Sequence, residues 1–334
     1  MRIIITILLC VLIPVCVQAN DAAVETAAGG LQLRNEKRIS IAKERLYIGK
    51  QPIGRDPSGL PNLQNKYRVS VEYEFMNESS KDVTTEVAFP LPHFRYVYED
   101  LISDRKVGGF KVEVDGRAQP YETVVRAIAK GRDVTDLLGG YGIGIETFGN
   151  YDIPSSEPGQ YQVERLPPKA QARLKAAGAI DDVLAPDWAV SITYHWKQTL
   201  PAGKVVRVRH EYDAIPGFSY GYDPSEYLSS LKGGCFKSEL TLGLRTAQKL
   251  AQNPEYNVPI RAEWVKYILT TAKTWKRPIR DFELVVEAPE GNFVSFCWDG
   301  KVEKLSNSRF RATAKDFVPK RELLIYFLSI DSEP

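Results

Sequence analysis

The chain has 334 residues, of which 43% are hydrophobic and 26% are charged, a composition typical of a globular protein with room for two domains. Its 44 Lys and Arg residues nearly balance its 42 Asp and Glu residues, and the formal net charge is +2. This balance excludes the strongly basic surface that nucleic acids or anionic membranes attract, so we expect no nucleic-acid partner.

The beginning of the chain has the three parts of a secretory signal peptide. Arg2 supplies the positive start, an apolar core follows, and the small residues before Asn20 fit a cleavage site. We therefore expect cleavage after Ala19 (residues 1–19 removed) and a periplasmic or extracellular mature protein. A lipoprotein processed at Cys16 is the alternative, but Val15 is larger than the residue that usually precedes a lipidated cysteine. No later run is long and apolar enough to span a bilayer.

Two cysteines remain in the expected mature chain, Cys235 and Cys297. In an oxidising compartment such a pair most simply forms one disulfide, which would contribute about 4 kcal/mol in the chain-entropy model. A catalytic or metal-binding cysteine is the alternative, but it needs a nearby histidine and none follows Cys235 in the sequence. We expect the disulfide, and we expect no metal site and no cofactor.

Alternation of apolar and polar residues predicts half-buried antiparallel strands after the expected cleavage site. In residues 67–77 valines and aromatic residues share one face, and charged residues occupy the other. Residues 83–91 alternate in the same way and run into two prolines, which suit a strand end because proline cannot donate to a ladder. We expect these two strands to form a hairpin, and Asp115 and Gly116 to form the turn of another.

The alternation disappears from about residue 119 to residue 186, where we expect a helical insertion. Residues 121–131 and residues 167–178 have helical character, and the second stretch has prolines at its start and a glycine at its end. Between them, Asp133 or Thr135 is expected to cap a short helix. Such an insertion interrupts a sandwich that a short loop could have closed.

Strand alternation resumes at residue 188 and continues to residue 212. Pairing apolar with apolar positions predicts a hairpin here, with a three-residue loop at 201–203. A connector follows, and we place a domain boundary near Pro216. Residues 238–252 have helical spacing and end at a proline, and the rest of the chain again reads as strands.

Three patterns that suggest catalysis or metal binding have the wrong context. Ser219 lies in a G-x-S-x-G pattern, but that pattern needs a later histidine and all three histidines precede it. In the expected hairpin, His210 points to the apolar face and His195 to the polar, solvated face, so the two cannot share one metal ion. Asp181 and Asp182 could serve acid–base chemistry on a sugar, but a solvated loop is the simpler interpretation.

The strand that ends in "VAFPLP" and the following "GGFKVEVDGR" resemble the vault/inter-alpha-trypsin (VIT) type of β-sandwich domain. A fuller resemblance spans nearly the whole mature chain and is to a bacterial exported family, domain of unknown function 4424. It is carried by "NDAAVETAAGGLQL", "GRDVTDLL", "YHWKQTLPAGKVVRVRHEY", "YILTTAKTWKRPIRDFELVVEAP" and "VSFCWDG". The resemblance implies a fold and a compartment but no reaction, and a bacterial host argues against use of the N-x-S sequon at Asn77.

The expected architecture is therefore mainly β, with two β-sandwich domains. The first, residues 20–215, is VIT-like and carries the helical insertion at about 119–186; the second, residues 216–334, is smaller and has one helix. We expect a non-catalytic binding or assembly module of the bacterial cell envelope, with an envelope protein or a glycan as partner. The alternatives are an enzyme acting on envelope glycans and a carrier of a lipid or small ligand between the sheets. The expected contact residues are Tyr141, Phe148, Tyr151, Tyr161, Tyr220 and Tyr222.

Overall fold

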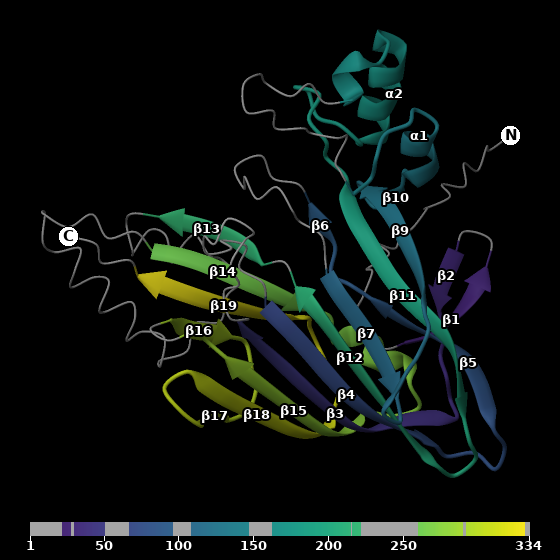
Figure 1. Ribbon diagram of the computed structural model, residues 1–334, viewed down its shortest axis with the longest axis vertical. Coiled ribbons are helices and arrows are strands. Elements are labelled where there is room, and N and C mark those ends of the chain that lie inside the picture. The colour runs from purple at the N-terminus through teal and green to yellow at the C-terminus, as the bar shows by residue number, and fades with distance from the viewer. Residues whose placement is uncertain are drawn as a thin grey trace, which may run out of the picture. The chain divides into compact units, whose positions relative to one another are not determined.

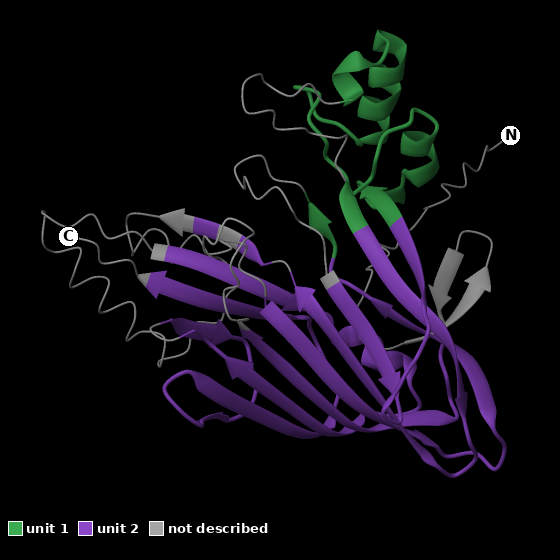
Figure 2. Ribbon diagram, in the orientation of Figure 1, with its two compact units in different colours: residues 1–17, 93–96, 126–190 green, residues 18–92, 97–125, 191–334 purple. Residues whose placement is uncertain are grey.

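The structure is a computed structural model, and its fold is mainly β, as the sequence predicts (Figure 1). It describes residues 22–27, 30–50, 67–95, 108–146, 162–214, 216–221, 260–289 and 292–330. The chain divides into two compact units (Figure 2). Unit 1 holds residues 1–17, 93–96 and 126–190, and unit 2 holds residues 18–92, 97–125 and 191–334. Within the described ranges, none of the helices has the length and apolar composition that crossing a bilayer requires.

An eight-stranded sheet in unit 2 organises the described residues, with the strand order β17-β18-β15-β3-β4-β12-β7-β8. Its neighbouring strands pair antiparallel except at its centre, where β3 and β15 pair in parallel. The strands are β3 (Ile39–Lys50), β4 (Tyr67–Asn77), β7 (Gly108–Val114), β8 (Arg117–Ala118), β12 (Val205–Ala214), β15 (Ile279–Glu287), β17 (Val302–Lys304) and β18 (Arg309–Phe317).

This sheet contradicts the expected domain boundary near Pro216. The parallel pair joins a strand from the beginning of the chain to one from its last fifth, with Leu46 opposite Leu284. Residues on both sides of Pro216 therefore belong to one hydrogen-bonded sheet and to one unit. Strand patterns in a sequence identify strands but not their partners, so a pairing between distant segments could not be anticipated.

Two further sheets contain the remaining strands of the described residues. One has the order β10-β9-β11-β5-β1-β2, with β6 also paired to β11, and the other has the order β13-β14-β19-β16. Ser219 lies within β13, so part of the expected connector is a strand. The bounds are β1 (Ala22–Ala27), β2 (Gly30–Leu33), β5 (Val83–Pro90), β6 (Phe94–Arg95), β9 (Glu122–Ala129), β10 (Arg132–Asp133), β11 (Ala189–Leu200), β13 (Gly217–Gly221), β14 (Ile260–Tyr267), β16 (Phe293–Phe296) and β19 (Leu323–Ile330).

Two of the three expected hairpins are wrong in the same way. Strand β4 pairs with β3 and β12, whereas β5 pairs with β11 and β1, so the turn between β4 and β5 passes from one sheet to another. The loop between β11 and β12 does the same in the opposite direction. The hairpin turn at Asp115 and Gly116 is confirmed: both residues have positive φ, and Val114 pairs with Arg117.

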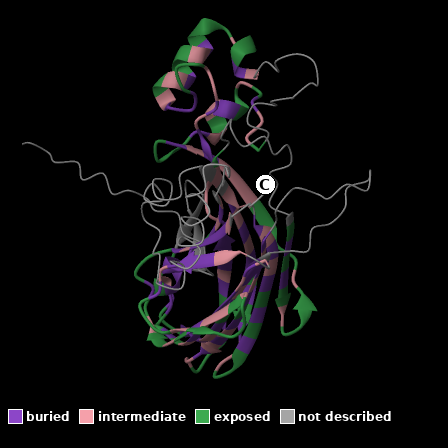
Figure 3. Ribbon diagram, turned by 90° about the vertical axis from the view of Figure 1, so that its left-hand side faces the viewer, coloured by how far each residue is buried: buried purple, intermediate pink, exposed green. Residues whose placement is uncertain are grey.

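The inner face of the eight-stranded sheet packs against the two other sheets within unit 2. Buried residues alternate with intermediate and exposed ones along strands of this unit (Figure 3). In strand β4 the odd-numbered residues from Tyr67 to Phe75 are at most 2% exposed. On one side the ring of Phe89 in β5 lies 4.9 Å from that of His210 in β12. On the other side Tyr67 stacks on Phe327 of β19 at 4.4 Å. The predicted apolar and charged faces of residues 67–77 are confirmed.

The outer face of this sheet carries charges whose sign changes from strand to strand, and we call it the striped face. Arg45 of β3 lies between Glu283 of β15 and Glu72 of β4, and Arg209 of β12 lies between Glu72 and Glu113 of β7. Opposite charges on neighbouring strands stabilise that pairing, and like charges oppose it. A second row repeats the order with Lys315, Asp281, Lys43, Glu74 and Arg207.

Unit 1 contains the described helices α1 (Thr135–Gly139), η1 (Gln162–Arg165) and α2 (Pro168–Ala177). Helix α2 is confirmed, and it ends at Gly178 in the left-handed conformation that glycine adopts without strain. The helix expected at 121–131 is wrong, because these residues form strand β9 and pair with β10. The N-cap of α1 is Val134 without a side-chain cap, and Asp133 instead accepts a hydrogen bond from the Thr135 amide. The helix expected at 238–252 lies outside the described residues.

Candidate functional site

The expected aromatic contact residues fall mostly outside the described residues. Tyr141 is described, and it lies half-buried in the turn that follows α1. Only the backbone of Tyr220 is described, and it pairs with Arg261 across β13 and β14. The aromatic contact surface therefore stays a prediction. The expected residues outside the described ranges are Phe148, Tyr151, Tyr161, Tyr222 and Cys235.

The two histidines of unit 2, His195 and His210, have different environments, as predicted. His195 is less exposed to solvent than expected. His210 is fully buried among aromatic rings, including that of Trp196 at 5.2 Å. His195 is not solvated: its side chain is only 12% exposed, and Nδ1 lies 2.8 Å from a Glu86 oxygen. Its Nε2 lies 3.9 Å from Glu122. No group of three or more His, Cys, Asp and Glu side chains in the described ranges is placed to hold a metal ion.

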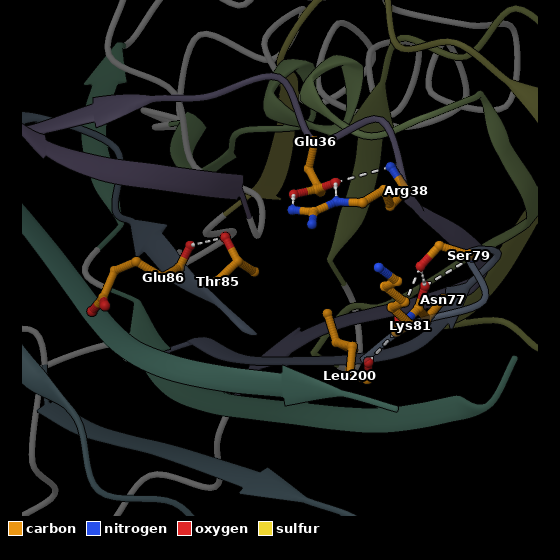
Figure 4. Close-up of polar contacts among 8 residues, drawn as sticks. All are labelled: Glu36, Arg38, Asn77, Ser79, Lys81, Thr85, Glu86 and Leu200. Atoms are coloured by element: carbon orange, nitrogen blue, oxygen red, sulfur yellow. Dashed lines mark hydrogen bonds and ion pairs between the residues drawn. The ribbon is translucent and has the colours of Figure 1, made fainter. Parts of the chain in front are cut away.

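Asn77 connects the two loops that pass between the sheets (Figure 4). Its amide nitrogen donates to the carbonyls of Lys81 and Leu200 at 2.9 and 2.7 Å, and its side-chain oxygen accepts from the Ser79 amide and hydroxyl. Its backbone also exchanges hydrogen bonds with the loop at 203–204. The residue is fully buried, so the side chain that begins the N-x-S sequon is occupied in the folded protein.

The buried Glu36, just before β3, forms an ion pair with Arg38, whose side chain is 45% exposed (Figure 4). Its two oxygens accept hydrogen bonds from the Arg38 guanidinium at 2.8 and 2.7 Å, and one also accepts from the Arg38 amide. The hydrogen bond from Arg38 lowers the pKa of Glu36. The Glu36 amide donates to the carbonyl of Thr274 in helix η2 (Thr270–Thr274), which joins the start of β3 to a late segment of the chain. These contacts hold the start of β3 in place.

A cleft of about 390 Å³ lies in unit 2 beside strand β18. Its walls come from Leu269 after β14, residues 297–300 after β16, residues 313–318 of β18 and beyond, and residues 320–323 leading into β19. The volume falls within the range of about 300 to 1,000 Å³ that is usual for small-ligand sites.

Six consecutive residues, 313–318, line this cleft. Successive side chains of a strand point to opposite faces of its sheet, so one face alone cannot provide six consecutive lining residues. The cleft therefore borders the end of β18, opposite residues 297–300. Strand β17 covers one edge of β18 only from Phe310 to Ala312, and none of the described strands pairs with that edge from Thr313 to Phe317.

The floor of the cleft is aromatic and firmly packed. The ring of Trp298 lies 5.5 Å from Phe282 and 5.3 Å from Phe317, and the two phenylalanine rings lie 4.7 Å apart. Trp298 is 7% exposed, whereas Val318 at the mouth is 47% exposed. Asp316 has a φ of 48°, a left-handed conformation that aspartate tolerates better than most residues. The cleft thus has a rigid apolar floor and an apolar residue at its entrance.

The rim of the cleft carries charges of both signs, most of which already have partners. Arg321 pairs with Asp299 at 2.5 Å, and Lys315 pairs with Asp281. Glu322 accepts hydrogen bonds from the amides of Leu269 and Thr270 and from the Thr270 hydroxyl. Among the described residues, two charged side chains at the rim have no such partner: Lys320 and Asp316.

The cleft also contains a residue that the sequence singled out. Cys297 contributes to its wall and is half-buried. Because Cys235 lies outside the described residues, the pairing of the two cysteines stays a prediction. The sequence did not indicate Trp298, Phe317 or Lys320 as site residues. The available signal was an apolar pair, Phe317 and Val318, at the end of a strand and directly before a proline and two basic residues.

A second hollow, of about 230 Å³, lies on the striped face. It is smaller than usual ligand sites, and its lining includes Arg45, Glu72, Glu113 and Arg209. Its charges neutralise one another, with Arg209 3.9 Å from Glu72. Balanced, solvated charges of this kind do not attract a ligand of either sign, so we favour the cleft beside β18 as the candidate site.

Solved structures align with this chain at low similarity. A protein described as a candidate nutrient-binding protein from Legionella pneumophila subsp. pneumophila is 14% identical, and the alignment covers 93% of this chain and 70% of that chain with a TM-score of 0.43. An M1 zinc metallopeptidase from Deinococcus radiodurans is 9% identical, and the alignment covers 88% of this chain and 43% of the peptidase with a TM-score of 0.31. At these scores neither structure carries an argument about function.

Sequence comparison gives a clearer result for the family than for the function. No curated protein sequence matches the chain. One family matches it over residues 19–56 and 63–326, which together make up most of the sequence. This match agrees with the resemblance noted from the sequence motifs. The chain therefore belongs to the family described as a domain of unknown function, DUF4424.

Proposed function

We propose that the protein is an exported, non-catalytic binding module of the bacterial cell envelope, and that the cleft beside β18 is its binding site. The observation that carries this proposal is the combination of a rigid aromatic floor with a charged rim in one cleft of about 390 Å³. Binding sites commonly have this composition, because an apolar floor provides affinity and a few polar groups fix the orientation of the ligand.

Rigidity supports binding in particular. Trp298 and Phe317 are held by each other and by Phe282, so the floor needs little rearrangement when a ligand arrives. Glu322 is likewise held by the amides of Leu269 and Thr270 and by the Thr270 hydroxyl. A ligand that enters the cleft therefore meets preformed contacts, and little of its binding free energy is lost to ordering side chains.

A fluorescent probe tests the cleft directly. Anilinonaphthalene sulfonate has an apolar body for the aromatic floor and one negative charge for Lys320. We expect saturable binding to the wild type, and we expect Val318→Asp to weaken it by about tenfold or more, since the new carboxylate lies at the mouth. Leu305→Asp is the matched control, because Leu305 is similarly exposed, at 43%, and does not line the cleft.

Two outcomes would count against the cleft as the site. One is equal binding of the probe to both variants and the wild type. The other is equal loss in both variants, which would indicate a surface other than the cleft. Melting temperatures must be measured alongside, because the probe also binds partly unfolded proteins. Both substitutions replace exposed side chains, so we expect melting temperatures close to that of the wild type.

Export requires a separate measurement. The proposal expects the protein in the osmotic-shock fraction of a bacterial host, with Asn20 as its first residue. Sequencing the N-terminus of that fraction tests both points. Protein retained in the cytoplasm with its first 19 residues, or a lipid-modified start at Cys16, would contradict the proposed export as a free periplasmic protein.

A further inference from the structure

We infer that the cleft takes an extended peptide segment of a partner protein, and that this segment adds as a strand to the open edge of β18. The inference rests on the proposed binding function of the cleft and goes further by naming the class of ligand. It follows from three features that occur together: an open strand edge, an aromatic floor beside it, and one uncommitted charge of each sign at the rim.

The open edge is the first feature. From Thr313 to Phe317, β18 pairs with β15 on one side and with none of the described strands on the other. In an antiparallel strand every second residue directs its N–H and C=O to the same side, so the open side offers a repeating set of donors and acceptors. A polypeptide in extended conformation is the ligand whose own donors and acceptors have the same repeat.

The dimensions agree with a short segment. The extended part of the edge runs from Thr313 to Lys315, about 10 Å, so it can pair with a peptide segment of similar length. Strand β17 ends the accessible edge at Ala312. At the other end Asp316, with a φ of 48°, interrupts the extended backbone before Phe317. The edge is therefore bounded on both sides, which limits the segment it can bind.

The floor and the rim of the cleft determine which side chains of the segment fit. A side chain that points to the floor meets Trp298 and Phe317, and Val318 covers it from the mouth, so an apolar residue fits there. Lys320 and Asp316 have no partner among the described residues, whereas the neighbouring charges are paired. A segment with one acidic and one basic side chain flanking an apolar residue complements both.

A glycan fits these features less well. Its hydroxyl groups can bond to single donors or acceptors, but they do not repeat with the spacing of a strand edge. Aromatic floors do bind sugar rings by stacking, but that contact uses none of the backbone donors and acceptors of the open edge. The peptide is therefore the better match to the edge, and a glycan is one outcome of the test below.

The test begins with a displayed library of short unstructured peptides, selected for binding to the wild-type protein. One selected peptide is then made in two forms, with N-methyl groups on alternate amides in either the odd or the even positions. A methylated amide cannot donate to a strand edge, as in proline. We expect one form to lose affinity by about tenfold or more and the other to bind like the unmodified peptide, because only one edge of the peptide faces β18.

Hydrogen exchange locates the contact. We expect the amides of Thr313–Phe317 that do not face β15 to exchange more slowly when the unmodified peptide is bound. We also expect Val318→Asp to weaken peptide binding and Leu305→Asp to leave it unchanged. Equal behaviour of the two methylated forms, or unchanged exchange along β18, would overturn the inference, as would a library that yields no binder.

Failure of the peptide and failure of the proposed function are distinguishable. If the fluorescent probe distinguishes Val318→Asp from Leu305→Asp but no peptide pairs with β18, the cleft remains a binding site and its ligand is a glycan or another small molecule. If neither the probe nor any peptide distinguishes the two variants, the cleft is not the binding site, and both proposals are wrong.

Discussion

The two faces of the eight-stranded sheet differ in how their residues contribute. On the inner face, polar groups are few, and two pairs of them form buried hydrogen bonds: the Tyr73 hydroxyl lies 2.9 Å from that of Tyr267, and Tyr67 donates to the buried Glu263 at 2.5 Å. On the striped face, charges are many and their contacts are loose, as with Arg207 and Glu74 at 3.6 Å. The inner face is stabilised by individual hydrogen bonds, whereas the striped face is characterised by the alternation of charge from strand to strand.

The difference indicates that stability and strand pairing are encoded separately. A buried hydrogen bond that loses one partner leaves a polar group without water or protein to replace it, which is costly. An exposed ion pair is replaced by water at little cost. The striped face instead makes a wrong neighbour unfavourable, because exchanging two strands would place like charges opposite each other. Four substitutions test this distinction.

Asn77→Ala is expected to have the largest effect. It removes the amide that holds both inter-sheet loops and leaves the carbonyls of Lys81 and Leu200 without that donor. We expect the free energy of unfolding to fall by about 3 kcal/mol, since each buried polar group left unsatisfied costs about 1 to 3 kcal/mol. Urea denaturation measures this. Ser79→Ala is the control, with a smaller expected loss, and equal effects of the two would argue against the central role of Asn77.

Tyr67→Phe separates the hydrogen bond of the inner face from its packing. The ring is kept, but Glu263 loses the hydroxyl donor and keeps Arg261 at 2.8 Å. We expect a loss of about 2 kcal/mol, as is typical of hydrogen bonds to charged groups. Tyr73→Phe removes a hydroxyl pair between neutral groups and should cost about 1 kcal/mol. A larger loss in Tyr73→Phe than in Tyr67→Phe would contradict the assignment.

Glu36→Gln tests whether burial or charge decides the cost. Glu36 is charged like the striped face but buried like the inner face, and its side chain is 2% exposed. We expect a loss of about 1.5 kcal/mol at neutral pH, because the charged hydrogen bonds to Arg38 weaken.

The pH dependence of this loss has a defined sign. Arg38 lowers the pKa of Glu36 below the ordinary value of 4.5, so the ionised carboxylate stabilises the fold above that value. The stabilisation disappears as the pH falls through the lowered pKa. The difference in unfolding free energy between wild type and Glu36→Gln should therefore shrink in acid. A difference that stays constant from pH 7 to pH 3 would show that the pair is not ionised in the way described.

Glu72→Gln is expected to have the smallest effect, less than about 0.5 kcal/mol, because Glu72 is exposed and its contact to Arg209 is long. An effect of the alternating charges on stability should appear only when a charge is reversed. Glu72→Arg places three cations side by side on β3, β4 and β12, because Arg45 and Arg209 are its neighbours. We expect Glu72→Arg to lower the free energy of unfolding more than Glu72→Gln does, and equal effects of the two would contradict a role of the striped face in pairing.

The sequence predicted which face of a strand is buried better than it predicted which strands pair. The two faces of residues 67–77 followed from alternation, and helix α2 followed from its prolines and its terminal glycine. Residues 121–131 contain small apolar residues at spacings that fit a helix or a strand, and pairing with β10 decided for the strand. The inter-sheet crossings of β4 to β5 and of β11 to β12 could not be predicted, because alternation identifies the buried side chains but not the neighbouring strand.

The candidate site could not be predicted from the sequence for a related reason. Expected contact residues were chosen from loops rich in aromatic side chains, whereas the cleft lies at the end of a strand. Its open edge is a property of the pairing, since β17 is shorter than β18. Phe317 and Lys320 belong to the same short stretch of sequence, but Trp298 reaches the cleft only through the arrangement of β16 and β19. No short sequence pattern could have predicted that these residues lie together in one cleft.

The parallel pairing of β3 with β15 also constrains how the chain can fold. Tyr47 and Glu287, which are hydrogen-bonded across this pair, are separated by 240 positions in the sequence. A ribosome that has made β3 and β4 has not yet made the strand that completes their sheet, so the final structure must form after most of the chain has been synthesised. Contacts of such long range also slow folding. For a chain that is exported as proposed, this late closure favours passage through the membrane before the sheet can form.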